Sequence, residues 1–283
     1  MSGVREVLHE AVRGGLARHE AEWALSELLG IQRLDLYSEP REVPAQAMER
    51  LKSIVVQRAQ GEPLQYLLGS AEFCGSRIIC KSGVFIPRPE TEAIVQAAIE
   101  AFGALAKAQE RPLRLVEFGV GSGCIALTLA KAFPACLIVG VEVSWNACSL
   151  AAQNVREHGV DGRVQLIQGS WDEAVRGSFD GVIANPPYIP TDHISRLPHD
   201  VQREPRTSLD GGTDGLRDIR QVLLAAARLV RPSGHIVLEC AETQVEDIAA
   251  DAVSSGWVSA ADTVYDFANR PRGVLLTVEK APH

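Results

Sequence analysis

The strongest constraint on the fold is the alternation of short apolar runs with helical patterns from residue 113 onward. Runs typical of strands lie at 113–118, 136–142, 164–168, 180–184 and 234–240. Stretches with the apolar spacing of helices lie among them, at 123–133, 145–158, 215–230 and 242–254. A chain that alternates in this way favours a parallel sheet with helices on both faces.

The end of the chain departs from this alternation. Two apolar runs, near 257–266 and 273–279, are joined by the short connector Asn269-Arg270-Pro271-Arg272-Gly273. Parallel neighbours need a crossover of a dozen or more residues, whereas antiparallel strands can be joined by a short turn. We therefore expect a doubly wound α/β sheet with an antiparallel last strand.

The beginning of the chain predicts small amphipathic helices instead. Apolar residues recur at helical spacing, as in Val4, Val7, Leu8 and Ala11, and the second such stretch ends at Gly30, a typical helix C-cap. A short hairpin is predicted over 72–80, with its turn at Gly75 and Ser76. We expect a helical domain over 1–68, a hairpin linker over 69–87 and the larger α/β domain over 88–283.

A glycine turn follows the first strand of the larger domain. The stretch Leu115–Gly123 contains Gly119, Gly121 and Gly123, and these glycines let the backbone approach a ligand closely. The G-x-G-x-G spacing differs from the G-x-G-x-x-G of dinucleotide-binding proteins, which disfavours a NAD-dependent oxidoreductase. No G-K-[ST] motif is present, so a ligand without a triphosphate is favoured.

Further polar and aromatic residues end the neighbouring strands. Glu142 ends the second strand, roughly 20 residues after the glycines, where an acid can accept hydrogen bonds from ribose hydroxyls. Glu117 precedes the glycines and is placed to face a cationic group. Trp171 and Asp172 follow the third strand, where an aromatic ring can stack on a base. The sequence therefore predicts a nucleoside-binding pocket at the C-terminal edge of the sheet.

The fourth strand ends in Asn185-Pro186-Pro187-Tyr188. The two prolines fix φ and remove two backbone donors, so this turn mainly offers acceptors. The Asn185 side-chain oxygen and the Pro186 carbonyl can accept both hydrogens of a planar –NH2 group, beside the flat face of Tyr188. The lone pair of such a nitrogen is delocalised into the neighbouring π system, which makes the nitrogen a poor nucleophile. Hydrogen bonds from both N–H groups to these acceptors favour a state in which the lone pair is free to attack. The turn predicts alkylation of a planar amine or amide.

Composition narrows the class of protein. The net charge is −8, and no Lys/Arg-rich run appears, which counts against nucleic acid as the main partner. No apolar run of membrane-spanning length and no signal-peptide core is present, so we expect a cytoplasmic protein. The six cysteines form no C-x-x-C pair and do not cluster with histidine, so we expect neither a disulfide framework nor a metal site.

Longer motifs resemble a known family. They are Gly61–Tyr66, the FIPRPETE stretch Phe85–Glu92, Glu117–Gly123, Asn185–Tyr188, and Glu204-Pro205 followed by Leu209–Leu216, which contains the D-G-G-x-D-G-L stretch. Together they resemble the class I S-adenosylmethionine-dependent methyltransferases, and among these the HemK-type release-factor glutamine methyltransferases. The Asn-Pro-Pro-Tyr turn is shared with adenine and cytosine amino-methyltransferases, whereas the FIPRPETE and D-G-G-x-D-G-L stretches are far more specific.

The resemblance implies a Rossmann-like fold, S-adenosylmethionine as cofactor, and a peptide-chain release factor as the protein substrate, docked with help from the N-terminal helices. The reaction it implies is methylation of the glutamine side-chain nitrogen in a Gly-Gly-Gln loop. The cofactor-binding residues implied are Glu117, Phe118, Gly119, Val120, Gly121, Glu142, Trp171 and Asn185. The catalytic residues implied are Asn185, Pro186, Pro187 and Tyr188. The family usually has Asp where Glu117 stands and often Asp at the position of Glu142.

Alternatives remain at this stage. The nearest is a glutamine methyltransferase acting on a ribosomal protein, which the Pro87–Glu92 segment disfavours because it matches the release-factor type. An exocyclic-amine DNA methyltransferase is disfavoured by the acidic balance. A non-catalytic cofactor-binding protein is disfavoured by the intact Asn185–Tyr188 turn. The polar segment 189–212 predicts a lid or docking loop.

Overall fold

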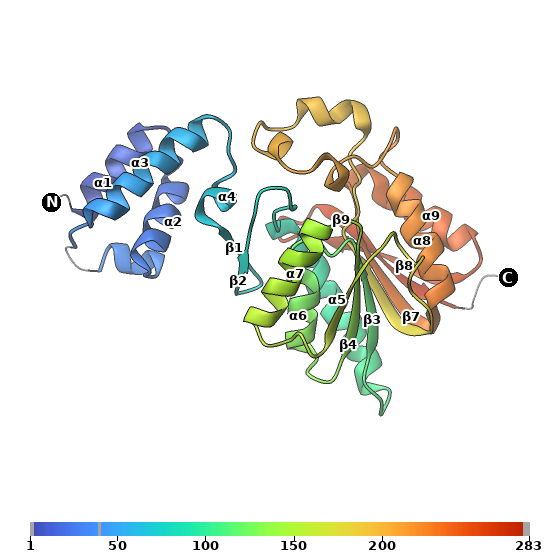
Figure 1. Cartoon of the computed structure of the whole chain (residues 1–283). Helices are drawn as coiled ribbons and strands as arrows, with labels where there is room; N and C mark the ends of the chain where they lie inside the picture. The colour runs from blue at the N-terminus through green and yellow to red at the C-terminus, as the bar shows by residue number, and fades with distance from the viewer. Residues whose placement is uncertain (1–2, 39–40, 280–283) are drawn as a thin grey trace. The chain divides into compact units, whose positions relative to one another are not determined.

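The described part of the chain, residues 3–38 and 41–279 of a computed structural model, contains the mixed sheet that the sequence predicts (Figure 1). The seven strands are arranged in the order β5-β4-β3-β6-β7-β9-β8. The first five are parallel, and β9 is antiparallel to both β7 and β8. Their bounds are β3 Arg114–Phe118, β4 Leu137–Glu142, β5 Val164–Gln168, β6 Phe179–Ala184, β7 Val230–Glu239, β8 Val258–Tyr265 and β9 Pro271–Val278.

Helices cover both faces of this sheet (Figure 1). One face carries α5, α6 and α7, and the other carries α8 and α9. Their bounds are α5 Pro89–Lys107, α6 Cys124–Ala132, α7 Trp145–Glu157, α8 Arg217–Leu229 and α9 Val245–Ser254. Within residues 3–38 and 41–279, no helix combines the length and apolar composition needed to span a bilayer.

Successive residues of each central strand contribute to two different cores. Leu115 and Ile183 pack with the α5–α7 layer, whereas Val116 and Val182 pack with the α8–α9 layer. Side chains of a strand alternate between faces, so a strand covered on both sides must be apolar at nearly every position. This requirement explains why the central strands appear in the sequence as continuous apolar runs.

Close packing between the sheet and α5 depends on a glycine in β6. A Cβ atom on Gly181 would overlap the ring of Phe102, which is fully buried and cannot move aside into solvent. The parallel register places Gly181 opposite Leu115 of β3 and His235 of β7, in the middle of the sheet. The absence of a side chain at this position therefore sets how closely α5 approaches the sheet.

A second compact unit contains the N-terminal helices. It comprises the described residues up to Ser70 together with Cys80–Ser82 and Pro198–Arg203. Its elements are α1 Val4–Arg13, α2 Arg18–Leu29, η1 Arg33–Leu36, α3 Ala45–Ala59 and α4 Leu64–Leu68. The later segment is held by polar contacts: Arg58 pairs with both Glu20 and Asp200, and Arg203 donates to the Gln60 carbonyl.

The predicted hairpin is present as β1 Ser70–Phe73 and β2 Ser76–Ile79. Its turn lies one residue earlier than expected, at Cys74 and Gly75, which have φ of 46° and 67°. Two successive residues with positive φ match the twist of paired strands, which makes this the usual turn of a two-residue hairpin. The sequence pattern favoured Gly75-Ser76 because cysteine rarely adopts positive φ.

The substitution Gly181→Ala should lower the free energy of unfolding by about 1–3 kcal/mol, the usual cost of overpacking a core. The matched control is Gly162→Ala, where no atom lies within 4 Å of the added Cβ. Urea unfolding followed by circular dichroism measures both variants. Equal stability of the two variants would contradict the packing role assigned to Gly181.

Candidate functional site

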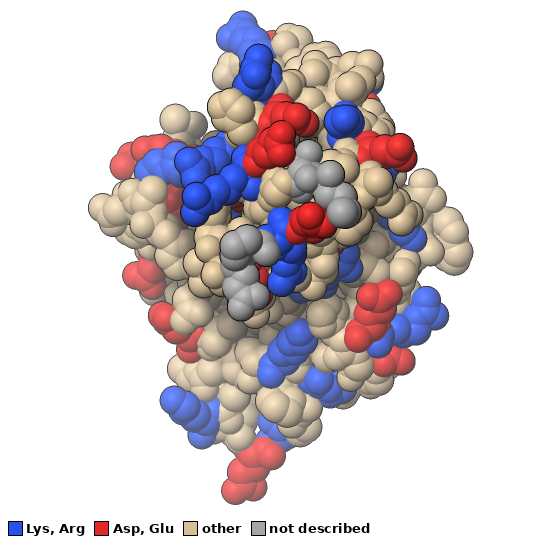
Figure 2. All heavy atoms as spheres, turned by 90° about the vertical axis from the view of Figure 1, so that its left-hand side faces the viewer, with Lys and Arg blue, Asp and Glu red and all other residues tan. Residues whose placement is uncertain are grey.

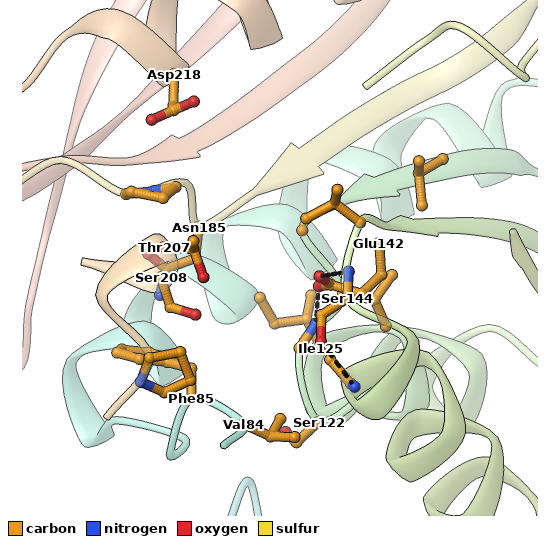
Figure 3. A pocket seen from close by; sticks show the side chains of 18 of the residues that line it. Val84, Phe85, Ser122, Ile125, Glu142, Ser144, Asn185, Thr207, Ser208 and Asp218 are labelled. Atoms are coloured by element: carbon orange, nitrogen blue, oxygen red, sulfur yellow. Dashed lines mark hydrogen bonds between the residues drawn. The ribbon is translucent and has the colours of Figure 1, made fainter. Parts of the chain in front are cut away.

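A cavity of about 320 Å³ lies at the carboxyl ends of β3, β4 and β6 (Figure 3). Its size is within the range of small-molecule sites. Figure 3 shows Asn185, Thr207, Ser208 and Phe85 on one side of the cavity, and Glu142, Ser144 and Ile125 on the other. Both walls come from the α/β unit, so the cavity has two chemically distinct sides within one unit.

The glycine turn after β3 forms part of the wall. Gly119, Gly121 and Gly123 have φ of 72°, 56° and 83°, a left-handed conformation that other residues rarely adopt. The buried side chain of Asn154 donates to the Ser122 carbonyl at 2.8 Å and so fixes the turn from behind. The sequence therefore builds a rigid turn whose bare backbone lies open to a ligand.

Glu142, the last residue of β4, closes the opposite end of this turn. Its carboxylate accepts hydrogen bonds from the backbone amides of Gly121 and Ser144, both at 2.9 Å. A carboxylate has about four lone-pair positions, so two remain for donors in the cavity that it lines. Valines and Trp171 line the cavity beside it. This side suits a ligand with neighbouring hydroxyls and a flat, uncharged ring.

Asn185, the first residue after β6, lies on the other side. Its side-chain nitrogen donates to the Thr91 hydroxyl at 3.1 Å. The nitrogen of the carboxamide is thereby engaged by the protein, and in Figure 3 the oxygen points into the cavity. A carbonyl oxygen held in this way is an acceptor aimed at an N–H donor of a ligand.

A buried carboxyl, Glu239 at the end of β7, supports this arrangement. The Tyr188 hydroxyl donates to one of its oxygens at 3.2 Å, while the other oxygen has no hydrogen-bond partner in the described chain. Burial raises the pKa of Glu239 to about 7, while the Thr91 and Tyr188 hydroxyls and the nearby Arg272 oppose the shift. Burial and the Glu239 charge in turn raise the pKa of Tyr188.

Glu117, the acid before the glycine turn, is fully buried. Within the described chain neither of its oxygens has a partner in hydrogen-bonding geometry. Burial raises its pKa well above the ordinary range; the Ala126 backbone amide opposes this shift and the nearby Glu142 adds to it. Such a carboxyl is held in its neutral form unless a cation or donor reaches it.

The predicted site residues therefore divide into two groups. Those that line the cavity are Gly119, Val120, Gly121, Glu142, Trp171, Asn185 and Pro187. Those that do not line it are Glu117, Phe118, Pro186 and Tyr188. Phe118 packs edge-on against the Trp171 ring, with 6.2 Å between the ring centroids, and so supports it from the core.

Several residues that line the cavity were not assigned a role from the sequence. Phe85, Arg88 and Thr91 belong to the FIPRPETE stretch, whereas Thr207 and Ser208 belong to the segment 189–212. Glu204 joins these two segments, because its buried carboxylate accepts from the Ile86 amide at 2.8 Å and pairs with Arg88. The FIPRPETE motif was the signal in the sequence that could have pointed to these residues. The contacts that its residues make could not be deduced from their spacing.

Two family models match the chain. The PrmC N-terminal domain matches residues 4–69, and the methyltransferase small domain matches residues 101–206. A release factor glutamine methyltransferase of Geobacter sulfurreducens is 40% identical over 235 residues, covering 82% of this chain and 80% of the relative. Another, of Moorella thermoacetica, is 37% identical over 283 residues, covering 96% and 97%.

Solved structures share the fold of the chain. The hMettl16 catalytic domain in complex with a MAT2A 3′UTR hairpin aligns with a TM-score of 0.56 at 13% identity, covering 83% of this chain and 82% of that one. A methyltransferase from Pyrococcus furiosus aligns with a TM-score of 0.53 at 18% identity, covering 82% and 98%. At these identities the likeness establishes a methyltransferase fold.

The raised pKa of Glu239 predicts a pH-dependent stability. Between the ordinary value of 4.5 and about 7, the folded protein retains a proton that the unfolded chain has lost. The free energy of unfolding should therefore fall as pH rises through this window, by up to about 3 kcal/mol. Glu239→Gln cannot ionise and should lack this contribution. Urea unfolding of the wild-type protein and the variant between pH 5 and 8 measures this contribution. A difference in unfolding free energy between the two proteins that does not change with pH would contradict the prediction.

Proposed function

Because the chain belongs to the family of release factor glutamine methyltransferases, we propose that it methylates the side-chain nitrogen of the glutamine in the Gly-Gly-Gln motif of peptide-chain release factors, in the cytoplasm. The observation that carries this proposal is the Asn185 carboxamide, which presents an acceptor to the same cavity that Glu142 lines. A planar amide nitrogen and a second ligand with hydroxyl donors thus have complementary partners in one site.

We propose S-adenosylmethionine as the second ligand. The glycine turn and the free lone pairs of Glu142 suit its ribose hydroxyls, and Trp171 with the neighbouring valines suits its adenine. No phosphate-binding motif accompanies the turn, in agreement with a ligand that has no phosphate. When bound, this cofactor supplies an electrophilic methyl group on a sulfonium sulfur.

The residues of the chain bind and orient the acceptor amide. The Asn185 oxygen accepts one N–H of the glutamine amide. The second acceptor that the motif implies is the backbone carbonyl of Pro186, a residue that does not itself line the cavity. These two acceptors hold the nitrogen in place and stabilise the positive charge that develops on it. Tyr188 supports the turn through its bond to Glu239 rather than lining the cavity. The proton lost by the nitrogen passes to solvent.

We also propose that the N-terminal helical unit contributes to docking of the protein substrate. The match of residues 4–69 to the PrmC N-terminal domain supports this role. On the face shown in Figure 2, Lys and Arg side chains are interspersed with Asp and Glu. This face therefore presents no extended positive field for a phosphate backbone, which favours a protein over a nucleic acid as the partner of this face.

The decisive experiment is incubation of the purified protein with purified release factors and S-adenosylmethionine, followed by peptide mass mapping. One added methyl group on the Gly-Gly-Gln peptide is expected, located on the glutamine by fragmentation. Release factors with glutamine replaced by glutamate are the control and should remain unmodified. Methylation of a ribosomal protein or of DNA in parallel reactions, with no modification of the release factors, would overturn the proposal.

The substitution Asn185→Ala should lower kcat by about 100- to 1,000-fold, the usual effect of removing one preorganised dipole. The fold should persist, because Asn185 follows β6 and is only partly buried. Gln96→Ala, which removes an exposed carboxamide on α5, is the control and should retain full activity. Radiolabelled methyl transfer to a release factor measures both variants. Near-normal turnover of the Asn185 variant would exclude the assigned role.

A further inference from the structure

We propose that three exposed aromatic side chains, Trp145, Tyr265 and Phe267, form a docking surface for the part of a release factor that surrounds its Gly-Gly-Gln loop. This inference rests on the proposed function, because it names the surface that binds the protein substrate of that reaction. The three side chains are 68%, 51% and 77% exposed, and none of them lines the cavity. Neither core packing nor the lining of the cavity therefore explains why these positions are aromatic.

The three aromatic residues lie at the same edge of the sheet as the cavity. Trp145 is the first residue of α7 and directly follows Ser144, which lines the cavity. Tyr265 is the last residue of β8, and Phe267 lies in the turn to β9. Because β9 is antiparallel to both β7 and β8, this turn lies at the carboxyl end of β7.

This grouping distinguishes the three side chains from ordinary surface residues. Single exposed apolar residues are common on soluble proteins and need no explanation. Within the part of the α/β unit that the structure describes, however, no other aromatic side chain is exposed. The restriction of exposed aromatic residues to the edge that carries the cavity indicates an interaction surface.

The turn that presents Phe267 is rigidly held. Asp266, which is 6% exposed, accepts hydrogen bonds from the backbone amides of Ala268 at 2.9 Å and Arg270 at 3.0 Å. Its own backbone amide donates to the Arg270 carbonyl, and its carbonyl accepts from the Asn269 amide, both at 2.9 Å. A side chain on a rigid support loses little freedom when a partner binds, so more of the contact energy appears as affinity.

An ion pair connects this turn to the wall of the cavity. Arg270 lies 3.9 Å from Glu90 in the first turn of α5. Glu90 stands between Arg88 and Thr91, two residues that line the cavity. An exposed pair of this kind contributes little to stability. Its value here is positional, because it places the turn with Phe267 beside the cavity, where a protein bound over the cavity reaches it.

The distance between the aromatic residues suits a protein partner. Trp145 follows β4 and Tyr265 ends β8, and these strands are five steps apart in the sheet. At about 4.8 Å per step, the two residues are separated by roughly 24 Å along the edge. The glycine turn after β3 and Asn185 after β6 lie between them. A small ligand cannot contact both ends, whereas a standard protein interface, with about 800 Å² on each partner, covers such a distance.

The charges beside the turn favour a protein over RNA. Aromatic side chains that stack on bases are accompanied by cations that neutralise the phosphates. Arg270, close to Phe267 in the chain, is paired with Asp266 at 2.9 Å and with Glu90 at 3.9 Å. Arg272 pairs with Asp266 as well, at 3.4 Å. Aromatic residues without free cations are typical of the contact surfaces between proteins.

The kinetic test uses the double variant Trp145→Ser/Phe267→Ser with two substrates, an intact release factor and a short peptide that contains Gly-Gly-Gln. For the release factor, KM should rise about tenfold with kcat unchanged, as expected when hot-spot side chains are truncated. For the peptide, kcat/KM should be unchanged, because neither side chain lines the cavity. An unchanged KM for the release factor would overturn the proposal. An equal loss with the peptide would also overturn it, since the effect would then lie inside the cavity.

The matched control is Val253→Ser. Val253 is 47% exposed near the end of α9, which leads into the start of β8 and so lies toward the opposite edge of the sheet. Its substitution should leave KM for the release factor unchanged. The control and the double variant should unfold at the same urea concentration, because all the substituted side chains are exposed. An equal rise in KM for the control would overturn the assignment of the effect to this edge.

A cross-linking test does not depend on turnover. Phe267→p-benzoylphenylalanine keeps an aromatic side chain and bonds covalently to a neighbouring C–H group on illumination. With purified release factors and RNA both present, the cross-linked peptides should flank the Gly-Gly-Gln loop, and Val253→p-benzoylphenylalanine should give none. Cross-links to RNA instead, or no cross-links beside normal methylation, would overturn the docking surface. Cross-links to a release factor without any methylation would refute the proposed function alone.

Discussion

The parallel pairing of β3 with β4 and β6 is the constraint on which the rest of the structure depends. Phe118 is in register with Val141 on one side and with Ala184 on the other. The residues that follow each strand therefore emerge at one edge, which brings the glycine turn, Glu142 and Asn185 together although they are far apart in the sequence. The bare backbone and the opposed acceptors of the cavity follow from this convergence.

Three carboxyl groups near this edge have different environments. Glu142 lines the cavity and accepts two backbone amides. Glu117 is buried without a hydrogen-bonding partner in the described chain, whereas Glu239 is buried but receives the Tyr188 hydroxyl at one of its oxygens. Burial raises the pKa of both buried acids, so the wall behind the cavity resists further negative charge. The same residue type thus serves as a ligand acceptor in one place and as an internal support in another.

The sequence predicted the fold and much of the site because those features depend on local patterns. Strand and helix alternation located the sheet, and the short connector near Pro271 correctly indicated an antiparallel last strand. Glycine spacing and Glu142 located one wall of the cavity. The insertion of β9 between β7 and β8 was not predicted, because strand order depends on long-range pairing. The turn at Cys74 was missed because a tertiary context overrides the preference of cysteine for negative φ.

The orientation of Asn185 lies beyond what local patterns can give. The residue type follows from the motif, and its position follows from the end of β6, but the direction of its carboxamide depends on a hydroxyl 94 residues away. The same turn is held through the Tyr188 hydroxyl, which donates to Glu239 at the end of another strand. Methyl transfer to an amide is sensitive to the difference between an acceptor and a donor at one atom. The chemistry of this turn is therefore a property of three elements packed together and not of the four-residue motif alone.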